Sequence, residues 1–145
     1  IRPPRLFAAV AFLSLWVCLI ALEEYASSNI PGSQAKPWPE YPGYIVALRI
    51  LAIGLLGPIA EELGFRGLLM AWIRRTRLGI VGAIVITAAL WSAIHLQYSP
   101  ALLMLIFVDG IVLGLARYYS RSLLLSMIMH IGGNLFSISQ SLGQL

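Results

Sequence analysis

The sequence is 145 residues long, 59% hydrophobic and only 11% charged, with a formal net charge of +4. Soluble domains carry about 25% charged residues, so this composition excludes an ordinary soluble protein and predicts one domain, residues 1–145, embedded in a lipid bilayer. The positive charge does not indicate a nucleic-acid partner, because the arginines lie at the ends of apolar segments, where they fix membrane topology.

Continuous apolar segments predict the spanning helices. Each is too long for a buried strand, and lipid offers no hydrogen bonds to the edges of an open sheet. We therefore predict an all-α fold, a polytopic transmembrane bundle of about five spans. The segments lie at residues 6–22, 44–73, 79–98, 101–118 and 122–140.

The first apolar segment follows Arg2 and Arg5, an arrangement that secretory signal peptides share. Glu23 and Glu24 come after it, where the cleavage site of a signal peptide would require small residues. The segment is therefore predicted to remain as a span. Its Cys18 is the single cysteine of the chain, so no internal disulfide is expected.

The stretch EEYASSNIPGSQAKPWPEYPG, residues 23–43, separates the first two apolar segments. Its Pro, Gly and Ser content predicts an exposed loop. Trp38 and Tyr41 in this stretch, and Tyr44 directly after it, indicate a membrane interface.

The second apolar segment, residues 44–73, is longer than a single crossing requires. Its 30 residues would extend about 45 Å as a helix, which exceeds the hydrocarbon thickness of a bilayer. We predict a break or kink near Gly57 and Pro58, because proline removes a helical hydrogen bond.

Arginines flank the predicted spans in a regular order. Counting through the spans puts the arginine-bearing ends on one face, which the positive-inside rule makes cytoplasmic together with the N-terminus. These arginines are Arg2, Arg5, Arg74, Arg75, Arg77, Arg117 and Arg121.

Three charged residues interrupt the second segment, in the stretch AEELGFRG. Each would cost about 2.5–3.5 kcal/mol at the centre of a bilayer if it were unpaired. Glu62 and Arg66 are four residues apart, with the acid on the N-terminal side, which favours an ion pair on one helix. Such a pair could serve only to join helices, but it leaves Glu61 without a local partner.

Both histidines of the chain also fall in predicted spans. His95 follows Trp91 by one turn, and His130 precedes Asn134 by one turn, so each pair shares a helix face. Counted from the arginine-rich ends, Glu61 and the two histidines reach a similar depth, which predicts one shared site.

Asp109 is the remaining acid within a predicted span. Three interpretations stay open for it: contact with the site, pairing with an arginine, or a protonated state bonded to a carbonyl group.

The residue types of the predicted site suit hydrolysis of an amide bond. A carboxylate beside a histidine can hold and deprotonate a water molecule. A second histidine and an asparagine amide can donate to the oxyanion that forms when water attacks a carbonyl group. The sequence contains no G-x-S-x-G and no H-E-x-x-H motif, which argues against a serine nucleophile and against that class of zinc protease.

Three motifs in order carry a family resemblance. They are E-E-x-x-x-R (Glu61 to Arg66), W-x-x-x-H (Trp91 to His95) and H-x-x-x-N (His130 to Asn134). Over residues 54–140 the sequence resembles the CPBP (CAAX protease and bacteriocin-processing, or Abi) family of intramembrane endopeptidases, which makes this range the motif-bearing catalytic core.

The resemblance implies a role for each motif residue. Glu61 would be the carboxylate that activates water, with His95 as its partner. His130 and Asn134 would line the oxyanion side. The two residues that would order the site are Glu62 and Arg66.

The sequence departs from the family pattern in its second motif. Trp91 stands where phenylalanine is usual, and Gln97, Tyr98 and Ser99 occupy the positions where relatives often carry Asn or His. Gln97 or Ser99 is expected to substitute for that residue.

Metal dependence is the open mechanistic choice. Glu61, His95 and His130 could form a three-ligand zinc site with an open position for water. Adjacent carboxylates on a helix point about 100° apart, which makes a shared ion difficult and favours a mechanism without a cofactor.

Three function classes remain open. The favoured one is an intramembrane endopeptidase that hydrolyses a membrane-associated peptide, of prenylated CAAX type or bacteriocin-like. The alternatives are a non-catalytic immunity or scaffold protein and a proton-coupled transporter, since intramembrane Glu and His also serve proton relays. The expected partners are the lipid bilayer and a peptide or protein substrate, and the expected location is the bacterial inner membrane.

Overall fold

The computed structural model describes residues 3–29, 38 and 41–143, and every regular element among them is helical. The expected all-α fold is therefore confirmed. One long helix, residues 43–73, consists of α2, α3 and α4 joined by two π-helical stretches. In chain order the elements are α1 (Leu6–Asn29), α2 (Gly43–Arg49), η1 (Ile50–Leu56), α3 (Gly57–Glu62), η2 (Leu63–Leu69), α4 (Met70–Ile73), α5 (Gly79–Ala93), α6 (Pro100–Ser120) and α7 (Leu123–Gly143).

Four helices of the described chain are long and apolar enough to cross a membrane: Leu6–Tyr25, Gly43–Ile73, Pro100–Ser120 and Leu123–Gly143. The fifth apolar helix, Gly79–Ala93, is shorter, with 15 residues. Large apolar side chains cover the outside of the bundle, among them Phe7, Val10 and Val17, which are 87%, 57% and 65% exposed. A surface of this kind suits lipid, so the protein is an integral membrane protein.

The predicted helix over residues 79–98 is wrong at its C-terminal end. The helix stops at Ala93, and residues 94–97 form turns, in which the His95 amide bonds the Ser92 carbonyl at 3.0 Å. Ser99 has extended backbone angles, because the proline that follows disfavours a helical residue before it. Ser99 then caps α6 by accepting a hydrogen bond from the Leu102 amide at 3.4 Å.

The predicted loop over residues 23–43 is wrong at its N-terminal end. Residues 23–29 continue α1, so both glutamates after the first apolar segment are helical. Residues 30–37 and 39–40 lie outside the described residues. The Arg49 guanidinium lies 4.7 Å from the ring centre of Trp38 and 5.2 Å from that of Tyr41, a cation–π arrangement.

The sequence predicts a break or kink near Gly57 and Pro58, and the break does not occur. The chain remains helical from residue 43 to residue 73, and the mismatch caused by proline is absorbed as π-helix instead. The Gly57 amide donates to the Ala52 carbonyl, five residues back, at the end of η1. Pro58 itself is buried.

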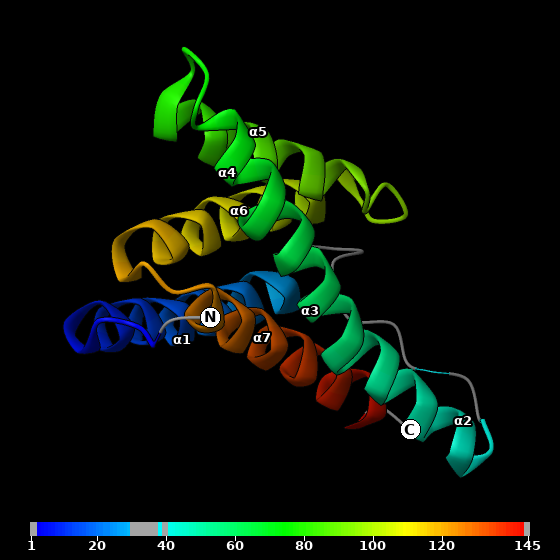
Figure 1. Ribbon diagram of the computed structural model, residues 1–145. Coiled ribbons are helices and arrows are strands. Elements are labelled where there is room, and N and C mark those ends of the chain that lie inside the picture. Colours follow the sequence, from blue (N-terminus) through cyan, green and yellow to red (C-terminus); the bar gives the residue numbers. More distant parts are fainter. Residues whose placement is uncertain (1–2, 30–37, 39–40, 144–145) are drawn as a thin grey trace.

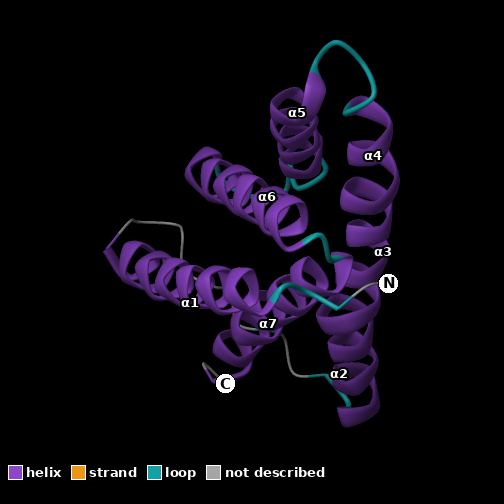
Figure 2. Ribbon diagram, turned by 60° about the vertical axis from the view of Figure 1, so that its left-hand side comes forward, coloured by secondary structure: helices purple, strands orange, loops and turns teal. Residues whose placement is uncertain are grey.

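Figures 1 and 2 show the long helix running past all the others as a single rod. The pair formed by α5 and α6 packs near its α4 end, and α7 lies against its middle, in contact with η1 and α3. Helix α1 contacts α6 and α7 but makes few contacts with the long helix. The middle of the long helix therefore faces α5, α6 and α7 together.

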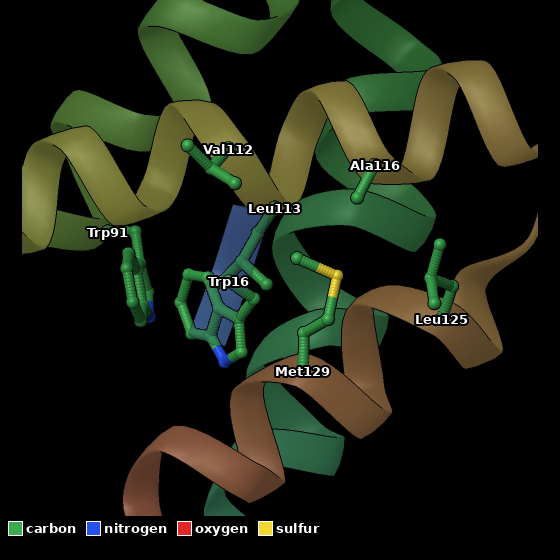
Figure 3. Packing of buried hydrophobic residues seen from close by; sticks show 7 residues of the cluster. All are labelled: Trp16, Trp91, Val112, Leu113, Ala116, Leu125 and Met129. Carbon is green, nitrogen blue, oxygen red and sulfur yellow. The ribbon is translucent and has the colours of Figure 1, made fainter. Parts of the chain in front are cut away.

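One apolar cluster joins these helices at the centre of the bundle. Trp16 from α1 lies between α6 and α7, close to Leu113 and Met129 (Figure 3). Trp91 from α5 belongs to the same cluster and is 5% exposed. The indole of Trp91 therefore has one side in the apolar core, and its other contacts are polar.

Helices α5 and α6 pack closely against each other. A Cβ atom at Gly110 would lie 2.9 Å from Cα and Cβ of Ala88 and 3.2 Å from the Trp91 ring. One turn later, a Cβ at Gly114 would lie 3.1 Å from Ile84. This small-residue stripe allows the two backbones to approach, as in other membrane helix pairs.

Gly110→Ala is expected to lower the free energy of unfolding by about 1–3 kcal/mol, because the new methyl group overlaps the Ala88 backbone and forces the helices apart. Denaturation in detergent measures the change. Gly132→Ala is the matched control, since nothing lies within 4 Å of its Cβ position. Equal stability of the two variants would contradict the close contact.

Candidate functional site

Polar side chains from three helices meet where the long helix passes α5 and α7. Backbone geometry prepares this place, because α3 is a short α-helical piece between two π-helical stretches. Such wide turns occur often at functional sites. The five residues, called here the polar cluster, are Glu61, Glu62, Arg66, Trp91 and His130.

The two adjacent glutamates of the polar cluster have different surroundings. The Glu62 side chain is completely buried, whereas the Glu61 side chain is 28% exposed. This difference follows from the turn of about 100° between neighbouring residues on a helix. Glu61 is therefore the carboxylate that a substrate or water can reach.

Glu62 and Arg66 form the ion pair that the sequence predicts. Nη1 of Arg66 lies 2.9 Å from Oε1 of Glu62, and both side chains are buried. The same guanidinium donates from Nη2 to the Gly110 carbonyl at 3.4 Å and lies 4.5 Å from the ring centre of Trp91. The pair thus joins the long helix to α5 and α6.

His130 connects the two glutamates. Its Nδ1 lies 3.2 Å from Oε1 of Glu62, and because a carboxylate can only accept, Nδ1 carries the hydrogen. Its Nε2 lies 3.8 Å from Oε2 of Glu61, beyond hydrogen-bond distance. The imidazole is therefore fixed by Glu62 and faces Glu61 with its other nitrogen.

Trp91 has a contact that the sequence analysis missed. Its indole Nε1 donates to Oε2 of Glu61 at 2.5 Å. The ring also lies edge-on to His130, with 5.0 Å between centroids. Phenylalanine at this position could not donate, so the departure from the family pattern was the available signal.

His95 lies close to the polar cluster but has different contacts. Its Nδ1 lies 2.8 Å from the Trp91 carbonyl, so this nitrogen carries the hydrogen and Nε2 is left as the acceptor of the neutral ring. The ring centroids of His95 and Trp91 are 5.4 Å apart. Among the described residues, no hydrogen bond or ion pair joins His95 to Glu61, and its role as partner stays a prediction.

The residues that were expected to support His95 also have defined positions. Ser99 serves as the N-cap of α6, with its hydroxyl turned to the Leu102 amide. Gln97 is exposed. Ser99 is thus occupied away from the polar cluster, and Gln97 points to the outside. The expectation that one of them replaces the Asn or His of relatives stays a prediction.

Asn134 holds a carbonyl group that the long helix cannot satisfy. Its Nδ2 donates to the Ile53 carbonyl at 2.8 Å. The usual helical partners of that carbonyl are occupied or missing, because the Gly57 amide bonds Ala52 and Pro58 has no N–H. Asn134 thus compensates for the proline, and one amide hydrogen remains for the expected oxyanion role.

Asn134→Leu is expected to lower the free energy of unfolding by about 1–3 kcal/mol, because it leaves the Ile53 carbonyl without a donor. In a Pro58→Ala background the same change should cost about 1 kcal/mol less, since the alanine supplies a backbone N–H for that carbonyl. A double-mutant cycle measured by detergent denaturation tests this. Equal costs in both backgrounds would show that the proline and the asparagine act independently.

Asp109 forms a second acidic contact that the sequence did not reveal. Its carboxyl group shares a hydrogen bond with that of Glu23 on α1, which requires a proton on one of the two. Arg66 is near enough to interact with Asp109 electrostatically. The three interpretations that the sequence left open for Asp109 did not include pairing with another acid.

The donor set for zinc is not assembled in the described part of the chain. No group of three His, Cys, Asp or Glu side chains there has an arrangement that could hold a metal ion. Nδ1 of His130 is directed at Glu62, and Nδ1 of His95 is directed at a backbone carbonyl. A zinc site formed by Glu61, His95 and His130 therefore stays a prediction.

Comparison with known proteins supplies independent information. A family model described as type II CAAX prenyl endopeptidase Rce1-like matches residues 43–136, which include every motif residue. An uncharacterised 24.3 kDa protein of Escherichia coli is 35% identical over 88 residues, which cover 59% of this chain and 40% of that protein. The chain thus spans less than half the length of this relative. No solved structure gives a significant match.

Proposed function

Since the chain belongs to the Rce1-like family of type II CAAX prenyl endopeptidases, we propose that it is an intramembrane protease in which Glu61 activates water. The observation that carries this proposal is the different burial of the adjacent residues Glu61 and Glu62. Glu62 is buried in an ion pair with Arg66, whereas Glu61 is 28% exposed, so water can reach its carboxylate.

The reaction needs one base and one donor. Glu61 takes a proton from water while the oxygen bonds to the carbonyl carbon of the substrate, which forms a tetrahedral oxyanion. The C–N bond then breaks, and Glu61 returns the proton to the leaving amine. Trp91 holds one oxygen of Glu61 in place, which leaves the other for water.

The remaining motif residues support the reaction in our proposal. Asn134 has one amide hydrogen beyond the bond to Ile53 and could donate to the oxyanion from α7. His130 faces Glu61 across 3.8 Å, and in our proposal it lines the oxyanion side. His95 is proposed to assist proton transfer through Nε2, because its Nδ1 is already bonded to a carbonyl group.

The substrate is proposed to be a membrane-associated peptide of the prenylated CAAX or bacteriocin-like type. The family name supports the first, and the exposed apolar surface of the bundle supports a substrate that arrives within lipid. A location in the bacterial inner membrane is part of the proposal, supported by the apolar spanning helices and by a relative from the bacterium Escherichia coli.

A reconstituted cleavage assay tests the proposal. Liposomes containing the full chain would receive a prenylated CAAX peptide, an apolar spanning peptide and a soluble peptide, and mass spectrometry would identify new termini. We expect cleavage of a membrane-anchored peptide only. The absence of any cleavage that depends on Glu61 would favour a non-catalytic immunity or scaffold protein instead.

The same assay tests the metal. The proposed reaction uses only groups of the chain, so activity should survive exhaustive chelation. Loss of activity in chelator that added Zn²⁺ restores, together with stoichiometric zinc by elemental analysis, would replace the glutamate mechanism by a metal mechanism.

A further inference from the structure

A basic cavity lies between the ends of α4 and α6, next to the polar cluster. Its volume is about 430 Å³, within the range typical of ligand pockets. Its lining contains no carboxylate. The polar groups that line it are Arg66, Arg74, Arg117, Arg121 and Tyr118.

The described residues that line this basic cavity do not balance its charges. Arg66 has Glu62 as its counter-ion, but the other three arginines have no acid in the lining. Arg74 and Arg117 lie close enough for their charges to repel. A concave site lined by charges of one sign attracts counter-ions, so the cavity favours a bound anion.

We propose that the basic cavity binds the phosphate group of an anionic phospholipid. Guanidinium groups match phosphate oxygens in charge and geometry, and basic pockets between membrane helices are typical sites for lipid phosphates. Met70, Ala71 and the ring of Tyr118 add apolar surface to the same lining.

The position of the basic cavity links the lipid to the polar cluster. Arg66 lines the cavity and also holds Glu62 at 2.9 Å. A phosphate in the cavity would join α4 to α6 close to the ion pair. The proposal does not depend on proteolysis, because binding can be measured without turnover.

The test uses the full chain purified in a zwitterionic detergent, with thermal midpoints recorded during titration. The probes are phosphatidylglycerol, phosphatidylcholine, inorganic phosphate and a peptide with a free C-terminal carboxylate. We expect phosphatidylglycerol to bind the wild type about tenfold more tightly than phosphatidylcholine. Arg74→Gln and the double variant Arg74→Gln/Arg117→Gln should lose that preference.

Arg75→Gln and Arg77→Gln are the matched controls, because both arginines are exposed on the turn after α4 and neither lines the basic cavity. They should keep the preference within about twofold. If the control variants lose the preference for phosphatidylglycerol to the same extent, the preference comes from overall surface charge, and the proposal is wrong. Binding of inorganic phosphate or the peptide carboxylate without binding of phosphatidylglycerol would overturn it as well. Arg74 is exposed, so Arg74→Gln remains informative if the double variant does not fold.

Discussion

Glu61→Gln is expected to lower peptide hydrolysis by about 10²–10⁴-fold while leaving the fold intact. The amide keeps the shape of the side chain, and its oxygen can still accept the hydrogen bond from Trp91. It cannot take a proton from water, so the base of the proposed reaction is lost. Turnover in the reconstituted assay gives the activity, and detergent denaturation gives the stability, which should change by less than about 0.5 kcal/mol.

Trp91→Phe serves as the graded comparison for Glu61→Gln. It preserves the ring in the apolar cluster but removes the N–H that holds Oε2 of Glu61. We expect a loss of about tenfold, the size of one hydrogen bond to a charged group. Wild-type turnover by Glu61→Gln would remove this glutamate from the mechanism, whatever the effect of the tryptophan.

The local parts of the site could be predicted from the sequence. An acid and an arginine four residues apart must lie on the same helix face, so the Glu62–Arg66 pair follows from helix geometry alone. The difference between the neighbouring glutamates follows in the same way. Contacts between helices could not be predicted, because the bonds from Trp91 to Glu61 and from His130 to Glu62 depend on how α5 and α7 are rotated and placed.

The helices also could be predicted only in part from the sequence. Apolar length predicted each helix, but their ends depend on individual residues that composition does not reveal. The predicted helix over residues 79–98 ends early, because a turn precedes Pro100. The polar residues 23–29 predicted a loop, yet they continue α1, and Glu23 among them forms the hydrogen bond with Asp109. Proline at residue 58 predicted a break, yet Asn134, 76 residues later in the chain, satisfies the carbonyl that proline leaves free.

Removing either partner of the buried ion pair should give the largest loss of stability. Glu62→Gln and Arg66→Met are each expected to lower the free energy of unfolding by about 3–5 kcal/mol, because each leaves a charge buried without its counter-ion. Activity should fall with stability, since His130 is also held by Glu62. Denaturation of the purified variants in detergent measures the loss, with Arg77→Gln as the control for an exposed arginine.

The double variant Glu62→Gln/Arg66→Met separates the ion pair from the packing around it. With both charges gone, no isolated charge is left in the buried pair, so much of the stability should return. Activity should not return, because His130 loses its charged partner and the guanidinium no longer bonds Gly110 or lies against Trp91. If the single variants melt with the wild type, or if the double variant is as unstable as the sum of the two, the ion pair does not hold these helices together and Glu62 must act in another way.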